Sequence, residues 1–530
     1  MKKYIFLLVA ALLVLGLVLP GCGGGQQEEE EEENFITFAV CGPMTDVQGI
    51  NHWNGATMAM EELNAAGGVD IGGTKYTVKL VKVETYESIE GESGDRASAN
   101  LLAVIDDVDF VIGGFRTEVV QVYREVAMDA GKIFMDCGAA TDSLTFSVVS
   151  NYDKYKYWFK GTPYNSTFLI TSMLKMTGTV AGVMKSTLQT LEATNAAYVK
   201  DDYKVSLATD EKLRVHILME NLSWCEGLVI AAQLYLPSRL PLTVTGTTLV
   251  SGTVTDISSE LSAIEAKKPH IIFVAFSGSV GAVYSIQKAQ LGIPAMTIGI
   301  NVPGQQLVHW DNTDGACEGE LILDTWGEGM YQTDYTEEWF NAYVDEFNMY
   351  PVYTANTYDA IKQLCRAAAA EDSVDSDDLI GWLEDPANAI TDSAATTKVM
   401  YYPWPDITIT PGTTYALSEA QVEALYPDSP IPYDQSKWLC MSLGGGHIAH
   451  DLVYGPDYMT GVGTQWQDGK KVGVWPKQLA PTGTPIETLV AMALADQYGN
   501  WNFQYPGAEK LILPIGNMLN IPWDAYENAI

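Results

Sequence analysis

Six short loops of the sequence combine glycine with Ser, Thr, Asn or Asp, and each directly follows a run of β-forming residues. They are CGPMTDVQGINHW, GGFRTE, CGAATDSL, MENLSWCEG, FSGSVG and GINVPGQ. Backbone N–H groups and small hydroxyls are hydrogen-bond donors that suit a small carboxylate. The same residue types also make ordinary turns and helix caps, and that alternative stays open for each loop taken alone.

Motifs of the common catalytic and nucleotide-binding sites are absent from the sequence: we find no nucleophile elbow, HExxH, P-loop or Gly-rich dinucleotide fingerprint. The one metal-like cluster, GGGHIAHD, contains His447, His450 and Asp451. Its three glycines favour a loop with hydrogen-bonded side chains over a metal site. We therefore predict no metal, no cofactor and no enzyme activity. A secreted hydrolase is the alternative class, although none of the six histidines lies in a recognisable catalytic context.

The N-terminus has the pattern of an export signal. Lys2 and Lys3 precede an apolar run over residues 4–19, which is short for a membrane span. The Gly21-Cys22 junction resembles the lipobox of bacterial and archaeal lipoproteins, with Pro20 as an unusual occupant, so we predict lipidation of Cys22. An uncleaved signal anchor is the alternative. Residues 23–34, rich in Gly and Glu, predict an extended tether.

Composition and net charge disfavour further classes of function. The chain has 530 residues, with 67 acids against 30 bases and a formal net charge of -37, which disfavours electrostatic binding to nucleic acid or to an anionic membrane surface. Roughly 500 residues follow the tether, enough for two or more domains. No later stretch is predicted to span a membrane. The six cysteines after Cys22 contain no CxxC pair, which disfavours a zinc cluster, and their pairing stays open.

Strand and helix patterns alternate along the chain. In a first unit we expect strands at 35–40, 76–83, 110–112 and 132–136, and helices at 53–69, 96–105 and 119–130. In a second unit we expect strands at 214–219, 271–275 and 295–300, and helices at 166–177, 226–236, 258–266 and 281–290. Extra, mostly helical residues are expected over 180–213. This alternation predicts an α/β fold with two doubly wound parallel sheets and a ligand cleft at their strand ends.

These segments, taken in order, resemble the type I periplasmic binding proteins of branched-chain amino-acid ABC importers. NGATMAMEELNAAGGV resembles that family's first helix, VDFVIGGFRTE, CGAATDSL, HIIFVAFSG and YPVYTANTYDAI follow in the family's order, and GPDYMTGVGTQWQDGKKVGVWP resembles the closing hairpins of one branch. The likeness runs over residues 35–476, interrupted at 180–213 and 401–433. It implies two lobes joined by a hinge, which close over a small ligand.

The resemblance also implies binding residues. The family holds a ligand carboxylate with a hydroxyl after the third strand and with two residues after the fourth, which here are Thr117, Ala139 and Thr141. An aromatic residue of the second lobe closes over the ligand, and Trp224 matches it. The remaining predicted ligand contacts in these loops are Thr45, Phe115, Ala140, Phe276 and Ser277.

Two positions depart from the family pattern and one cation is added. Gln48 stands where the family has a tyrosine, and Asn301 where it has the acid that holds the ligand ammonium. Arg116 adds a guanidinium, which suits bidentate capture of a carboxylate. The ligand is then a small organic acid, or an amino acid whose ammonium finds Glu118 or Glu220. An ion pair between Arg116 and Glu118 is the alternative.

The expected domain organisation follows from this resemblance. Residues 1–22 form the signal sequence and 23–34 the tether; lobe 1 comprises 35–158 and about 326–395, lobe 2 comprises 159–325 and about 396–480, and 481–530 form a C-terminal extension. The chain is expected to be a lipid-anchored, extracytoplasmic monomer that delivers a small carboxylate-bearing ligand to an ABC permease. A sensor ectodomain of the same fold is the alternative within this family.

Overall fold

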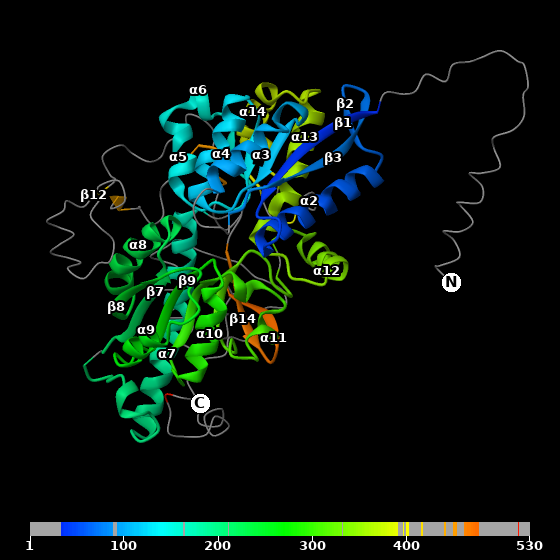
Figure 1. Cartoon of the computed structure of the whole chain (residues 1–530). Helices are drawn as coiled ribbons and strands as arrows, with labels where there is room; N and C mark the ends of the chain where they lie inside the picture. Colours follow the sequence, from blue (N-terminus) through cyan, green and yellow to red (C-terminus); the bar gives the residue numbers. More distant parts are fainter. Residues whose placement is uncertain are drawn as a thin grey trace, which may run out of the picture. The chain divides into compact units, whose positions relative to one another are not determined.

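The computed structural model describes residues 33–87, 93–162, 165–209, 211–330, 332–390, 396, 399–401, 415–416, 439–440, 449–452, 461–475 and 518. Within them the chain forms two large β-sheets and a two-stranded third sheet (Figure 1). The signal sequence with Cys22, nearly all of the tether, His447 and nearly all of the C-terminal extension lie outside the described residues.

The first sheet has six strands in the order β2-β3-β1-β4-β5-β6. Its strands are β1 (Asn34–Gly42), β2 (Val69–Ile71), β3 (Thr74–Glu84), β4 (Phe110–Gly113), β5 (Phe134–Asp136) and β6 (Trp158–Lys160). The pairs β1–β4, β4–β5 and β5–β6 are parallel, and β2–β3 is antiparallel. The helices along this part of the chain are α2 (Val47–Ala65), α3 (Ser93–Leu102), η1 (Ile105–Asp107), α4 (Thr117–Asp129), α5 (Asp142–Ser150) and α6 (Tyr152–Tyr155).

The second sheet has seven strands in the order β15-β14-β11-β10-β9-β7-β8. Its strands are β7 (Leu213–Glu220), β8 (Leu242–Val250), β9 (Ile271–Phe276), β10 (Met296–Asn301), β11 (Leu321–Asp324), β14 (Val462–Gln467) and β15 (Lys470–Trp475). Five neighbouring strands of this sheet are parallel: β8, β7, β9, β10 and β11. The hairpin β14–β15 joins β11 antiparallel. The helices along this part are α7 (Ser166–Thr194), η2 (Asp201–Tyr203), α8 (Ser223–Arg239), α9 (Ser258–Glu265), α10 (Val280–Gln290), η3 (Pro303–Gln305) and α11 (His309–Asn312).

Both faces of each large sheet are buried. In β1, Phe38 and Val40 pack into one apolar cluster while Ala39 and Cys41 pack into another, since successive side chains of a strand point to opposite faces. The second sheet divides in the same way between two clusters. The fold prediction, α/β with two doubly wound parallel sheets, is confirmed.

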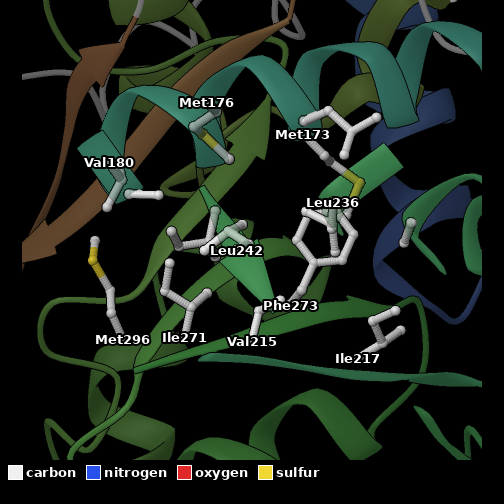
Figure 2. Packing of buried hydrophobic residues seen from close by; sticks show 14 of the residues in the cluster. Met173, Met176, Val180, Val215, Ile217, Leu236, Leu242, Ile271, Phe273 and Met296 are labelled. Carbon is white, nitrogen blue, oxygen red and sulfur yellow. The ribbon is translucent and has the colours of Figure 1, made fainter. Parts of the chain in front are cut away.

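Helix α7 is longer than the sequence pattern suggests. It runs for 29 residues, through Thr194, and so absorbs part of the extra segment expected after residue 180. Met173, Met176 and Val180 project from it onto β-strands of the second sheet (Figure 2). By length and hydropathy α7 would also pass as a membrane span, contrary to the expectation from sequence, but 67% of its apolar window is buried inside the protein. It is the core helix of the second sheet.

After β11 the chain returns to the first sheet. The returning helices are α12 (Thr336–Phe347), η4 (Tyr353–Asn356), α13 (Thr357–Glu371), α14 (Ser376–Glu384) and η5 (Pro386–Asn388). Helix α13 packs on α2 and β4. The small third sheet pairs β12 (Tyr415–Ala416) with β13 (Leu439–Cys440). Five cysteines in the described part of the chain are buried free thiols: Cys41, Cys137, Cys225, Cys317 and Cys365.

Candidate functional site

A pocket lies between residues at the strand ends of the two sheets. Its lining consists of Phe115, Arg116, Thr117, Gly138, Ala140, Leu169, Trp224, Ser277, Ile300, Val302, Gln305, Leu323 and Tyr353. The space between them is about 550 Å³, a volume that includes open solvent. Ligands of open α/β sheets bind at such carboxyl ends of strands.

The turn after β4 brings Arg116 and Thr117 to the pocket. Gly113 and Gly114 have φ angles of 110° and 96°, a region that glycine enters without strain. A Cβ at Gly113 would lie 2.1 Å from the carbonyl oxygen of Cys41, so no larger residue fits there. Beyond this turn Arg116 takes the N-cap position with extended backbone angles, and α4 begins at Thr117.

The hydroxyls of Thr117 and Thr141 connect the first turns of two helices. Their Oγ1 atoms are 2.7 Å apart; Thr117 is the first residue of α4 and Thr141 is the N-cap of α5. One hydroxyl proton is shared between the two oxygens, so the other can be donated to a ligand. The partial positive charge at both helix N-termini favours an anion at this point.

Arg116 is the one charged residue among the described residues that line the pocket. Its backbone N–H donates to the buried carboxylate of Glu87, whose pKa burial raises to about 7. Its side-chain Nε is buried without a partner, and the described residues offer its guanidinium no ion pair. Glu118, the alternative partner, instead accepts the backbone N–H of Ser223 at 3.0 Å. The guanidinium is therefore available to a carboxylate ligand.

Trp224 comes to the pocket from the second sheet. It is the second residue of α8, it lines the pocket, and its indole Nε1 is buried without a partner. The Glu118 carboxylate bonds the first residue of α8, Ser223, from α4, so this contact joins the two sides of the pocket. Trp224 thus brings an indole N–H without a hydrogen-bond partner to the pocket from α8.

Most of the remaining wall is apolar. Its apolar and aromatic residues are Phe115, Leu169, Ile300, Val302, Leu323 and Tyr353. Gln305, in η3, is a polar exception: its Nε2 donates to the carbonyl oxygen of Leu323 at 2.9 Å, while its Oε1 is buried without a partner. Ser277 also lines the pocket, but its hydroxyl donates to Glu220 at 2.6 Å. The site can thus bind a ligand with an apolar body and an anionic end.

Half of the predicted ligand-binding residues line this pocket. They are Phe115, Arg116, Thr117, Ala140, Trp224 and Ser277. Thr141 is connected to it through the hydroxyl of Thr117. Ligand contact by these residues stays a prediction.

Thr45 and Gln48 lie outside the lining. Thr45 is exposed in the turn before α2. Gln48 is buried in α2, and its Nε2 donates to the carbonyl oxygen of Ser277 at 3.4 Å. Gln48 therefore connects α2 to the loop after β9, at a residue that lines the pocket.

Ala139 and Phe276 also lie outside the lining, and each has another partner. The backbone N–H of Ala139 donates to Asp136 Oδ1 at 2.9 Å, so it is not available to a ligand in this arrangement. Phe276 is fully buried in an apolar cluster against Tyr284. We therefore assign Ala139 and Phe276 to the support of the pocket.

None of the residues considered for a ligand ammonium is among the described lining residues, although Asn301 Oδ1 has no hydrogen-bond partner. Asn301 is fully buried outside the lining, with its Nδ2 3.4 Å from Glu320 Oε2. Its neighbours Ile300 and Val302 line the pocket instead, because successive residues of a strand face opposite ways. Glu220 accepts the hydroxyl of Ser277 and the next backbone N–H, both at 2.6 Å. Among the described residues that line the pocket, none carries a carboxylate.

Several lining residues were missed by the sequence analysis: Gly138, Leu169, Ile300, Val302, Gln305, Leu323 and Tyr353. Alternation along β10 could have identified Ile300 and Val302 once Asn301 was assigned to the opposite face. Tyr353 lies in the YPVYTANTYDAI segment, which carried a family likeness but no role. Leu323 has no polar loop signal at all.

The His and Asp cluster makes structural contacts. His450 Nε2 lies 2.6 Å from Glu384 Oε1, and the ring stacks on Phe159 at 3.9 Å between centroids. Asp451 accepts a hydrogen bond from Asn165. Within the described residues, no group of three or more His, Cys, Asp or Glu side chains is placed to hold a metal ion.

Comparisons with known proteins identify the family of the chain and structures of similar fold. A family model described as periplasmic binding protein matches residues 37–403. Solved structures with a similar fold include a leucine-binding protein of Thermotoga maritima (TM-score 0.56, 14% identity, covering 83% of this chain and 97% of that one). A branched-chain amino acid substrate-binding protein of Streptococcus pneumoniae in complex with isoleucine has a TM-score of 0.55 at 14% identity, covering 83% and 98%.

A further similar structure is an ABC transporter solute-binding protein of R. palustris in complex with benzoate, with a TM-score of 0.55 at 13% identity, covering 83% of this chain and 95% of that one. A search of curated protein sequences finds no match. At these identities the structural similarities show the fold alone.

Proposed function

Because the chain belongs to the periplasmic binding protein family, we propose that it captures a small carboxylate-bearing solute outside the cytoplasm and delivers it to an ABC permease. The family consists of solute-binding proteins that catalyse no reaction, which removes the hydrolase alternative. The chain is accordingly a solute-binding protein of the ABC-transporter type.

One observation supports a carboxylate group on the ligand most directly. An unpaired guanidinium, Arg116, lies in a largely apolar pocket next to the bonded hydroxyls of Thr117 and Thr141. Guanidinium and hydroxyl donors beside helix N-termini bind carboxylates. The similar proteins of known complex bind isoleucine and benzoate, and both ligands carry a carboxylate, so at this level amino acids and other organic acids are both candidates.

Calorimetry with a panel of small acids and amino acids tests this function. Arg116→Met should weaken binding of every carboxylate ligand at least tenfold, since hydrogen bonds to charged groups contribute about 1.5–3 kcal/mol. Arg239→Met removes an exposed cation at the end of α8 and should leave the affinity unchanged. Wild-type affinity in Arg116→Met would place the ligand elsewhere.

Membrane anchoring through Cys22 and transport remain part of the proposal. The Lys2-Lys3 start, the apolar run and the Gly21-Cys22 junction support a lipid anchor. Uptake of the labelled ligand by host cells, with and without this gene, separates transport from the sensor alternative: a receptor for import is required for uptake, whereas loss of a sensor leaves the permease working.

A further inference from the structure

The pocket lining has more hydrogen-bond donors without a partner than acceptors without a partner. Two N–H donors lack a partner, Arg116 Nε and Trp224 Nε1, and one acceptor does, Gln305 Oε1. Among the described lining residues one side chain is cationic and none is anionic. An amino acid brings both a carboxylate and an ammonium, and the ammonium needs an anionic or carbonyl partner once it leaves water.

Carboxylates exist near the pocket, but protein donors already occupy them. Four buried acids lie at or near the carboxyl ends of the strands: Glu87, Asp136, Glu220 and Asp324. Glu220 is bonded by Ser277 and the following N–H, and Asp324 pairs with the buried Lys471 at 2.5 Å.

The other two acids are bonded as fully. Asp136 pairs with Lys160 at 2.5 Å and accepts the N–H of Ala139. Glu87 accepts the backbone N–H of Arg116 and the hydroxyl of Thr85. A carboxylate has about four acceptor sites, so these bonds do not by themselves exclude a further donor. None of the four acids belongs to the described pocket lining, however, so a ligand ammonium in the pocket does not meet one directly.

The other acids and amides near the pocket also lie outside its described lining, including the half-buried Asp46, on which the charge of Arg116 acts. Asn301 faces Glu320 on the far side of β10, and Glu118 bonds the first N–H of α8. An α-ammonium lies within a few ångströms of its own carboxylate, and it would therefore sit beside the Arg116 guanidinium as a like charge. The single acceptor of the lining, Gln305 Oε1, is a neutral amide oxygen.

We infer that the solute is an apolar carboxylate without an α-ammonium group, its carboxylate at Arg116 and Thr117 and its hydrocarbon or aromatic body against Leu169, Ile300, Leu323 and Tyr353. This inference rests on the proposed function and narrows its ligand class. The described lining selects against amino acids because it supplies a cation and N–H donors for an anion, but only one neutral acceptor, Gln305 Oε1, for an ammonium. A hydroxyl on the ligand body is compatible with the site, since Gln305 Oε1 can accept it.

Matched ligand pairs test the inference on the unmodified full-length protein. We would titrate 3-phenylpropanoate against phenylalanine, and 4-methylpentanoate against leucine, by calorimetry at pH 7. Each pair has the same carbon skeleton and differs only in the α-ammonium group. In at least one pair the deaminated acid should bind at least tenfold more tightly than its amino acid, and 3-phenylpropanamide, which has no charge, should bind at least tenfold more weakly than 3-phenylpropanoate.

A substitution in the lining should change this preference. Gln305→Glu places a carboxylate in the pocket and should lower the ratio of acid to amino-acid affinity at least tenfold. Gln290→Glu adds the same charge at the exposed end of α10 and should leave the ratio unchanged.

The outcomes separate the two proposals. Equal or tighter binding of the amino acid in both pairs overturns the inference and leaves the proposed function standing. Absence of binding by all four carboxylates overturns both.

Discussion

Thr117→Val tests the carboxylate site with the smallest change in shape. Valine keeps the β-branch of threonine and replaces only the hydroxyl by a methyl group. Thr117 is 5% exposed, and its Oγ1 lies 2.7 Å from that of Thr141. The substitution therefore removes one member of the hydroxyl pair at the start of α4 without opening a cavity.

The expected size of the effect follows from the hydroxyl pair. Two hydroxyls bonded to each other have one proton left for a ligand, and the bond orients it. Loss of a hydrogen bond to a carboxylate costs about 1.5–3 kcal/mol, so Kd should rise roughly ten- to hundredfold. Folding stability should fall by about 1 kcal/mol, the contribution of one neutral hydrogen bond.

Calorimetry with 3-phenylpropanoate and leucine, together with urea unfolding, measures both effects. Thr117→Ser restores the hydroxyl and should recover most of the affinity. Thr190→Val removes an exposed hydroxyl of α7 and should change neither affinity. Thr117→Val and Thr141→Val should be non-additive, because each breaks the same bond. An unchanged Kd in Thr117→Val for every ligand that binds the wild type would refute the assignment of this hydroxyl.

Three other predictions concern different parts of the chain. Glu118→Ala removes the cap of α8 at Ser223 and should raise the ligand Kd roughly two- to fivefold by calorimetry, whereas Glu118→Gln, which keeps an acceptor, should stay near wild type; equal losses would contradict the cap. Burial raises the pKa of Glu320 from 4.5 to about 7, so its protonation stabilises the fold fully below pH 4.5, and this stability is lost as the pH rises through 7. Relative to wild type, Glu320→Gln should thus be roughly 3 kcal/mol more stable at pH 8 than at pH 4.5 in urea unfolding, and a difference independent of pH would count against it. Cys22→Ala should appear in the soluble fraction or as an unprocessed precursor, and a variant anchored and processed like wild type would exclude lipidation.

Most of the strands and helices could be predicted from the sequence, because each is indicated by a pattern within a few consecutive residues. Each parallel strand is a short apolar run followed by a loop with glycine, and the helices carry apolar residues at helical spacing. The strand β8 was missed, since Leu242–Val250 contains four threonines and a glycine and lacks a continuous apolar run. The full length of α7 was missed because its apolar residues surround most of the helix, where it packs between α8 and the second sheet.

Only part of the pocket lining could be predicted from the sequence. A shift of one residue along a strand changes the face to which a side chain points, and the sequence pattern does not fix that position to the single residue. The loops after β4 and β5 led to Arg116, Thr117 and Ala140, as strand-end position alone predicts. Position along the chain also suggested Asn301, but the pleat of β10 turns that side chain toward Glu320. Whether Glu118 paired with Arg116 or capped α8 depended on the approach of two segments about 100 residues apart, which no local pattern encodes.

The charge in the pocket, that of Arg116, is positive, whereas the net charge of the chain is negative. The two charges act on a ligand over different distances. The net charge of -37 is spread over a surface whose field is screened beyond about 8–10 Å at physiological salt. Arg116, Thr117 and the N-terminus of α4 act on a ligand at hydrogen-bonding distance, in a pocket with apolar walls that weaken this screening. The acidic surface therefore slows the approach of an anion at low ionic strength. The donors of the lining decide which ligand stays bound.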